Sequence, residues 1–120
     1  MITTITFVRK QKALDRETFY ERWCAHTRDW DLRDHPYISN RLIMLEEGAE
    51  FVGITENHWP NQEALTEAIA WYETEAGQAH WTDLEGFMDA ANSPTSVVTH
   101  EVDVSANKGV EWIVRPESAE

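Results

Sequence analysis

Two kinds of apolar pattern divide the chain. Four short stretches are rich in apolar, β-branched and aromatic residues, and the first and last alternate apolar with polar positions, as strands do. Three other stretches repeat apolar residues every three or four positions, as amphipathic helices do. We therefore expect strands at residues 2–8, 37–45, 51–59 and 97–104. We expect helices at residues 15–28, from 61 to the glycine at 77, and at 78–91.

The first predicted helix carries one titratable ring on its apolar side. Asp15 can cap its N-terminus, and Leu14 and Phe19 have the spacing of a hydrophobic staple. Phe19, Trp23 and His26 fall at i, i+4 and i+7, so they share one face. The helix dipole at that end favours a charged imidazole and burial favours a neutral one, a balance that suits acid–base chemistry. The alternative is a hydrogen-bonded core histidine.

The order of the elements predicts the fold. Strand, helix, strand, strand, helix, strand is the order of an α+β, ferredoxin-like split βαβ fold with a four-stranded antiparallel sheet. One sheet face would be bare and apolar in a monomer, so we expect a second copy to cover it and complete a dimeric α/β barrel. We assign residues 1–104 to this domain and 105–120 to a C-terminal extension, whose apolar segment at 110–114 should pack as an extended arm.

Composition and charge exclude several classes of partner. The 120 residues fit one domain, and 22 acidic against 10 basic residues give a net charge of −12. Such a surface repels phosphate backbones and anionic lipid heads, so we expect no nucleic-acid and no membrane partner. The single cysteine, Cys24, excludes an internal disulfide, and a cytoplasmic location fits the absence of a signal-peptide pattern. The six Trp, four Phe and three Tyr can line a pocket for a flat organic molecule.

The third predicted strand offers two different sets of polar side chains. Glu56 and His58 lie two residues apart and point to one face, whereas Thr55 and Asn57 point to the other. Glu56 with His58 would form an acid–base pair, and Asn57 would donate a hydrogen bond to a carbonyl or enolate oxygen. The pattern leaves open which set lines a pocket, and a solvated strand end is the alternative.

Several histidines and aspartates raise the question of a metal site. They stand at positions 26, 35 and 58 and at 29, 31 and 34. No H-x-x-x-H or H-E-x-x-H spacing is present, so we expect no metal. Asp29 follows His26 by three positions and is assigned to the binding site, where it would orient the ring. Trp81 opens the apolar face of the last helix and is a candidate pocket wall.

Three segments resemble the EthD family of dimeric α/β-barrel proteins. Phe19, Trp23 and His26 match its F-x-x-x-W-x-x-H helix. The stretch V-G-I-T-E-N-H-W at 52–59 is similar to its D-G-I-A-E-L-W-F strand, and D-L-E-G-F-M-D at 83–89 is similar to its D-x-x-x-F segment. The resemblance covers residues 1 to about 104. It implies small, cofactor-free homodimers that act on aromatic or lactone compounds, with the helical histidine as the acid–base residue.

We therefore expect a cofactor-independent lyase or isomerase. It would decarboxylate, cyclise or isomerise a small aromatic, lactone or polyketide-like compound by proton transfer at His26. The other assigned residues are Asn57, His58 and Glu56 for catalysis, and Trp23, Tyr37, Trp81 and Asp29 for substrate binding. Two alternatives remain: a non-catalytic small-molecule-binding accessory protein, and a cofactor-free monooxygenase.

Overall fold

The computed structural model describes residues 1–29, 39–105 and 109–114. Its elements in chain order are β1 (Ile2–Val8), α1 (Arg16–Asp29), β2 (Ser39–Met44), β3 (Gly53–Trp59), α2 (Gln62–Trp71), α3 (Glu75–Glu85), a 3₁₀ turn (Ala90–Asn92), β4 (Thr95–Val97), β5 (Glu101–Ser105) and β6 (Gly109–Val114). Within the described ranges, no helix is both long enough and apolar enough to cross a membrane.

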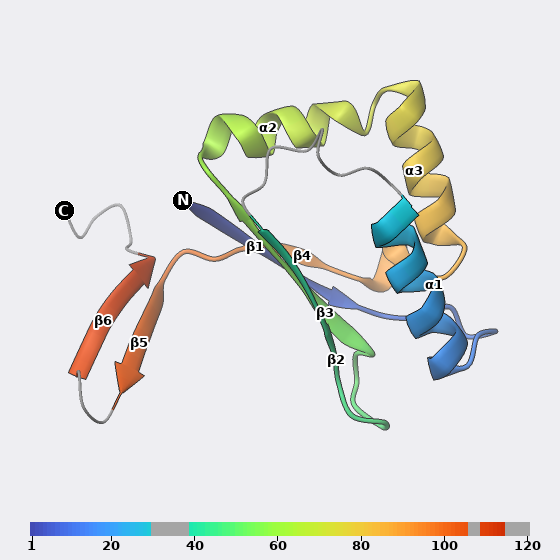
Figure 1. Cartoon of the computed structure of the whole chain (residues 1–120), viewed down its shortest axis with the longest axis horizontal. Coiled ribbons are helices and arrows are strands. Elements are labelled where there is room, and N and C mark those ends of the chain that lie inside the picture. The colour runs from blue at the N-terminus through green and yellow to red at the C-terminus, as the bar shows by residue number, and fades with distance from the viewer. Residues whose placement is uncertain (30–38, 106–108, 115–120) are drawn as a thin grey trace.

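Strands β1 to β4 form one antiparallel sheet in the order β2-β3-β1-β4. Figure 1 shows α1, α2 and α3 together on one side of this sheet. This arrangement confirms the expected α+β, ferredoxin-like fold. Strands β2 and β3 pair on either side of a turn that contains Gly48, whose φ of +90° favours glycine.

Strand pairing divides the sheet residues between two faces, which we call the helix face and the open face. Thr4 and Asn40 both lie opposite Asn57, and opposed residues share a face. The helix face also carries Thr6, Leu42 and Thr55. The open face carries Thr3, Ile5, Phe7, Arg41, Ile43, Ile54, Glu56 and His58.

The core lies between the helix face and α1. Phe19 and Trp23 of α1 are buried with ring centroids 5.3 Å apart, and Phe19 lies 5.7 Å from Phe87. Burying a side chain of this size stabilises the fold by about 1.5–3 kcal/mol. The predicted cap is confirmed: the Thr18 backbone N–H donates to Asp15 Oδ1 at 2.7 Å and lowers the pKa of that carboxyl. Helix α1 is thereby fixed at its start and along its buried side.

The helix expected at 78–91 is wrong in both of its bounds. Helix α3 spans Glu75–Glu85, with Thr74 as its cap, so Gly77 lies in the first turn and is not a break. A Cβ on Gly77 would stand 2.1 Å from the Trp71 carbonyl oxygen, so glycine is needed for α3 to approach the end of α2 this closely. Phe87 is buried beyond the helix end.

The fourth strand of the sheet is present, but the bounds expected for it, 97–104, are wrong. The strand that pairs with β1 is β4 (Thr95–Val97), and the pairing ends with a hydrogen bond of 2.8 Å from the Val98 backbone N–H to the Thr3 carbonyl oxygen. The chain that follows pairs with β6 instead, so β5 and β6 form a separate hairpin that starts before the boundary assigned at residue 104. Figure 1 shows this hairpin standing away from the main sheet.

Candidate functional site

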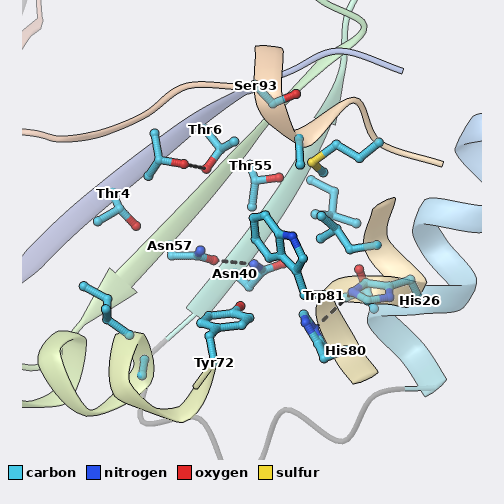
Figure 2. A pocket seen from close by; sticks show the side chains of 18 of the residues that line it. Thr4, Thr6, His26, Asn40, Thr55, Asn57, Tyr72, His80, Trp81 and Ser93 are labelled. Atoms are coloured by element: carbon cyan, nitrogen blue, oxygen red, sulfur yellow. Dashed lines mark hydrogen bonds between the residues drawn. The ribbon is translucent and has the colours of Figure 1, made fainter. Parts of the chain in front are cut away.

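A cavity of about 350 Å³ lies between the helix face of the sheet and the three helices (Figure 2). Its size suits a small organic molecule. The sheet contributes mainly hydroxyl and amide side chains, and the helices contribute mainly aromatic and aliphatic ones. A bound ligand would therefore meet a polar floor and an apolar wall.

The floor of the cavity is polar but neutral. Asn40 donates a hydrogen bond through its amide nitrogen to Asn57 Oδ1 across β2 and β3. Thr6 and Thr95 share a hydrogen bond of 2.7 Å between their hydroxyls, and Trp59 Nε1 donates to Thr4 Oγ1 at 3.0 Å. Among the described residues that line the cavity, none is Lys, Arg, Asp or Glu. The floor can bind ligand oxygens but offers no permanent positive charge to a carboxylate.

The wall of the cavity is aromatic. Trp23 comes from α1, Trp81 from α3, and Tyr72 is the C-cap residue that follows α2. The rings of Tyr72 and Trp81 meet edge-on with centroids 5.9 Å apart. Burial raises the pKa of the Tyr72 phenol, so this group stays protonated at neutral pH and can donate a hydrogen bond.

Two histidines and a carboxylate form a chain at the α1–α3 contact. His26 Nδ1 lies 2.6 Å from Asp83 Oδ2, and His26 Nε2 lies 3.0 Å from His80 Nε2. His26 and His80 are only 6% and 5% exposed, and both line the cavity, whereas the Asp83 side chain is 48% exposed. The carboxylate accepts a hydrogen bond from His26 Nδ1 and so holds the ring in one orientation.

The local structure explains how this chain assembles. His80 and Asp83 stand three positions apart on α3, so both face α1. Arg22 of α1 donates through Nη1 to the Gly86 carbonyl oxygen at 2.7 Å, which ties the middle of α1 to the C-cap of α3. His26 follows Trp23 by three positions, and the buried Trp23 ring fixes the rotation of the helix about its axis.

The structure brings four of the predicted site residues to the cavity: His26, Asn57, Trp23 and Trp81. Glu56 and His58 lie instead on the open face, where His58 Nε2 is 2.6 Å from Glu56 Oε1 and His58 Nδ1 is 3.2 Å from Thr3 Oγ1. That pair cannot reach a ligand in the cavity, because the sheet lies between them.

Two other predicted residues cannot be placed. Tyr37 lies outside the described residues, as do the candidates at 31, 34 and 35. Asp29 ends α1, but its side chain is not among the described ones. The carboxylate that the structure places on His26 is Asp83. His26 and His58 are on opposite sides of the sheet and so cannot bind one metal ion together.

The sequence analysis missed His80, Asp83, Tyr72 and Asn40 as site residues. One signal was present for the first two, since an i, i+3 pair of titratable residues on an amphipathic helix shares a face. Asn40 could be recognised only from its pairing with Asn57, which depends on the register of β2.

Comparisons with known proteins agree on the fold. The sequence matches no family model and no curated protein. SnoaB, a cofactor-independent oxygenase from Streptomyces nogalater, superposes with a TM-score of 0.58 at 13% identity, over 83% of this chain and 92% of SnoaB. An EthD family protein from Bacillus halodurans gives a TM-score of 0.56 at 16% identity, over 82% of this chain and 97% of that one.

The third similar structure belongs to a protein that is described as dimeric. A protein of unknown function from Bacteroides fragilis, described as dimeric and of ferredoxin-like fold, gives a TM-score of 0.55 at 7% identity, over 81% of this chain and 91% of that one. The fold of this chain is that of the EthD and SnoaB structures. The resemblance to EthD proteins is thus confirmed for the fold, and identities this low extend no further.

Proposed function

We propose that the protein is a cofactor-independent enzyme that moves a proton on a small, neutral aromatic or lactone-like compound, with His26 as the acid–base residue. The observation that carries the proposal is the His26 ring at the cavity wall with Asp83 on its Nδ1 at 2.6 Å. A carboxylate in this position fixes the tautomer of a histidine and stabilises the imidazolium that forms when it accepts a proton.

The rest of the cavity supports such a reaction. Removal of a proton next to a carbonyl places negative charge on the carbonyl oxygen, and nearby hydrogen-bond donors stabilise this oxygen. Asn57 and the protonated phenol of Tyr72 are such donors. Because the described lining has no cation, it favours isomerisation or cyclisation of a neutral compound over decarboxylation of an acid.

A second candidate is a cofactor-free oxygenase. The likeness to SnoaB favours it, as does a cavity that combines Trp23, Trp81 and Asn57. Deprotonation by His26 would be its first step as well, because a substrate anion reacts with oxygen more readily than the neutral compound does. The two candidates therefore share the histidine and differ only in whether oxygen is consumed.

We also propose that the protein is a homodimer, held by the open faces of two sheets. Ile5, Ile43 and Ile54 lie on that face, and Phe7 there is 37% exposed without a helix over it. The neighbour from Bacteroides fragilis is described as dimeric. An interface of this type should bury well over about 1,000 Å². A cytoplasmic location stays a prediction.

The test uses 2-tetralone, a neutral bicyclic ketone with acidic C–H bonds. Protein-dependent exchange of its α-protons in D₂O is followed by NMR, and dissolved oxygen is measured in parallel. We expect exchange, and we expect His26→Gln to slow it by about 10²–10⁴-fold. His100→Gln, an exposed histidine between β4 and β5, is the matched control and should keep the wild-type rate. Binding without exchange would indicate an accessory protein, and oxygen uptake would indicate the oxygenase.

A further inference from the structure

We propose that Asp83, His26 and His80 form a proton relay between solvent and the cavity, in which the two imidazoles share one proton and His80 is a second acid–base group. The inference rests on the proposed function and adds to it His80 as a second acid–base group and Asp83 as the connection to solvent. It is carried by the two short contacts along the chain and by the contrast in exposure between its ends.

The positions of the protons follow from the contacts. His26 Nδ1 faces a carboxylate oxygen at 2.6 Å, so this nitrogen carries a proton and donates it. His26 Nε2 and His80 Nε2 are 3.0 Å apart, and a hydrogen bond between two ring nitrogens requires one proton between them. When His26 is neutral, His80 Nε2 is the donor. When His26 is charged, its own Nε2 is the donor.

This arrangement lets a proton move without any movement of the rings. A proton taken from a substrate in the cavity enters at His80 Nδ1, because His26 Nδ1 donates to Asp83 and the two Nε2 atoms share a proton. The substrate becomes an anion and the histidine pair a cation. The proton between the two Nε2 atoms then shifts from His80 to His26, and His26 Nδ1 passes its own proton to the Asp83 carboxylate and on to water. The substrate anion regains a proton by the reverse path. In a cavity whose described lining has no Lys or Arg, the charged pair also balances the substrate anion.

The surroundings favour such a path along the chain. His26 and His80 are almost fully buried, whereas nearly half of the Asp83 side chain meets solvent. From the end of α2, the Tyr72 ring lies 5.5 Å from His80, and burial raises the pKa of its phenol, so it adds no charge. From α1, Arg22 places its guanidinium on the Gly86 carbonyl oxygen. Among the residues that the structure describes, Asp83 is thus the carboxylate in direct contact with the pair.

The first test needs no substrate. In the full chain labelled with ¹⁵N-histidine, a hydrogen bond between two ring nitrogens produces a measurable scalar coupling between them. We expect this coupling between His26 and His80 in the wild type, its loss in His80→Gln, and its retention in the control His100→Gln. It should also disappear in acid once both Nε2 atoms carry protons. No coupling at any pH between 5 and 9 would overturn the relay, since the shared proton is its central element.

The second test uses the exchange of 2-tetralone α-protons. We expect His80→Gln and Asp83→Asn each to slow exchange by about tenfold or more. The control is Glu85→Gln, an exposed carboxylate on the same helix, which should not change the rate. The double variant His26→Gln/His80→Gln should be no slower than His26→Gln alone, because members of one relay are not additive.

These outcomes separate the two proposals. The role of His80 would be overturned if His80→Gln changed neither the tautomer of His26 nor the exchange rate of the 2-tetralone α-protons. Coupling in a wild type that never exchanges 2-tetralone would overturn the proposed proton-transfer function on enolisable ketones while the shared proton stands. Exchange of the 2-tetralone α-protons by a wild type that shows no coupling between His26 and His80 would overturn the relay, while the proposed function stands.

Discussion

Gly53 of β3 lies directly against the indole ring of Trp23 from α1. A Cβ built on Gly53 would stand 2.7 Å from Trp23 Cζ3 and 2.6 Å from the Ile43 carbonyl oxygen. The absence of a side chain at this position therefore sets how closely α1 approaches the sheet. His26 follows Trp23 by one helical turn, so the same contact also sets the position of the histidine at the cavity.

Gly53→Ala should destabilise the protein by about 1–3 kcal/mol, because the new methyl group meets a buried ring and a backbone oxygen that cannot both move away. Chemical denaturation measures the loss. Gly86→Ala is the matched control, since its nearest obstacle is the end of the flexible Arg22 side chain. Equal stability of the two variants would show that the Gly53 contact does not fix the helix.

Asn57→Leu should destabilise the fold by about 1–3 kcal/mol, because it leaves the Asn40 amide nitrogen without its acceptor in the cavity floor. The double variant Asn40→Leu/Asn57→Leu should lose less than the sum of the two single losses, since it removes both partners together. Denaturation of all four proteins completes the cycle. Strict additivity would mean that the two amides are not coupled.

Tyr72→Phe should make the protein more resistant to alkaline denaturation. Burial raises the pKa of the Tyr72 phenol above its ordinary value of 10.0. A raised folded-state pKa gives stability that is present below the unfolded-state value and is lost as pH rises through the folded-state value. Above pH 10, the wild type should therefore lose stability faster than Tyr72→Phe. Parallel stability profiles from pH 8 to pH 11 would contradict this.

Removal of the β5–β6 hairpin contacts should weaken assembly. Val102 and Val104 are 41% and 69% exposed, and a lone two-stranded hairpin is at best marginally stable in water. We expect the hairpin to dock on a second copy. Val102→Ser/Val104→Ser should then raise the dimer dissociation constant in sedimentation velocity. Asp103→Ser, at an alternate position of the same strand, should leave it unchanged. An unchanged dimer in both variants would place the hairpin outside the interface.

Local sequence was enough to predict α1 and its cap. Asp15, Phe19, Trp23 and His26 act within one helix, and the 3.6-residue period alone places the last three on its buried face. The order of elements was likewise enough for the fold, because few topologies accommodate that order.

The histidine chain could not be predicted in the same way. Asp83 and His80 are 57 and 54 positions from His26, and periodicity shows which face of a helix is buried but not which helix covers it. The bounds of the fourth strand could not be predicted for a related reason. The alternation at 97–104 indicates a strand but does not identify the strand with which it pairs.

One feature of the sequence distinguishes the two faces of β3. Gly53, Thr55, Asn57 and Trp59 share a face, and Trp59 is the bulkiest apolar residue of the strand. A large indole ring favours the core side, which would have assigned Asn57 to the cavity and Glu56 to the open face.

The two faces of strand β3 carry side chains of different chemical character, and this affects how the cavity could evolve. A shift by one residue relative to β1 and β2 would exchange the neutral amide and hydroxyl floor for the Glu56–His58 pair, because alternate residues point to opposite faces. A single insertion or deletion in the turn around Gly48 is one route to such a shift. Descendants of this chain could thus acquire a carboxylate and a third imidazole in the cavity by a change in length, without altering one residue of the strand itself.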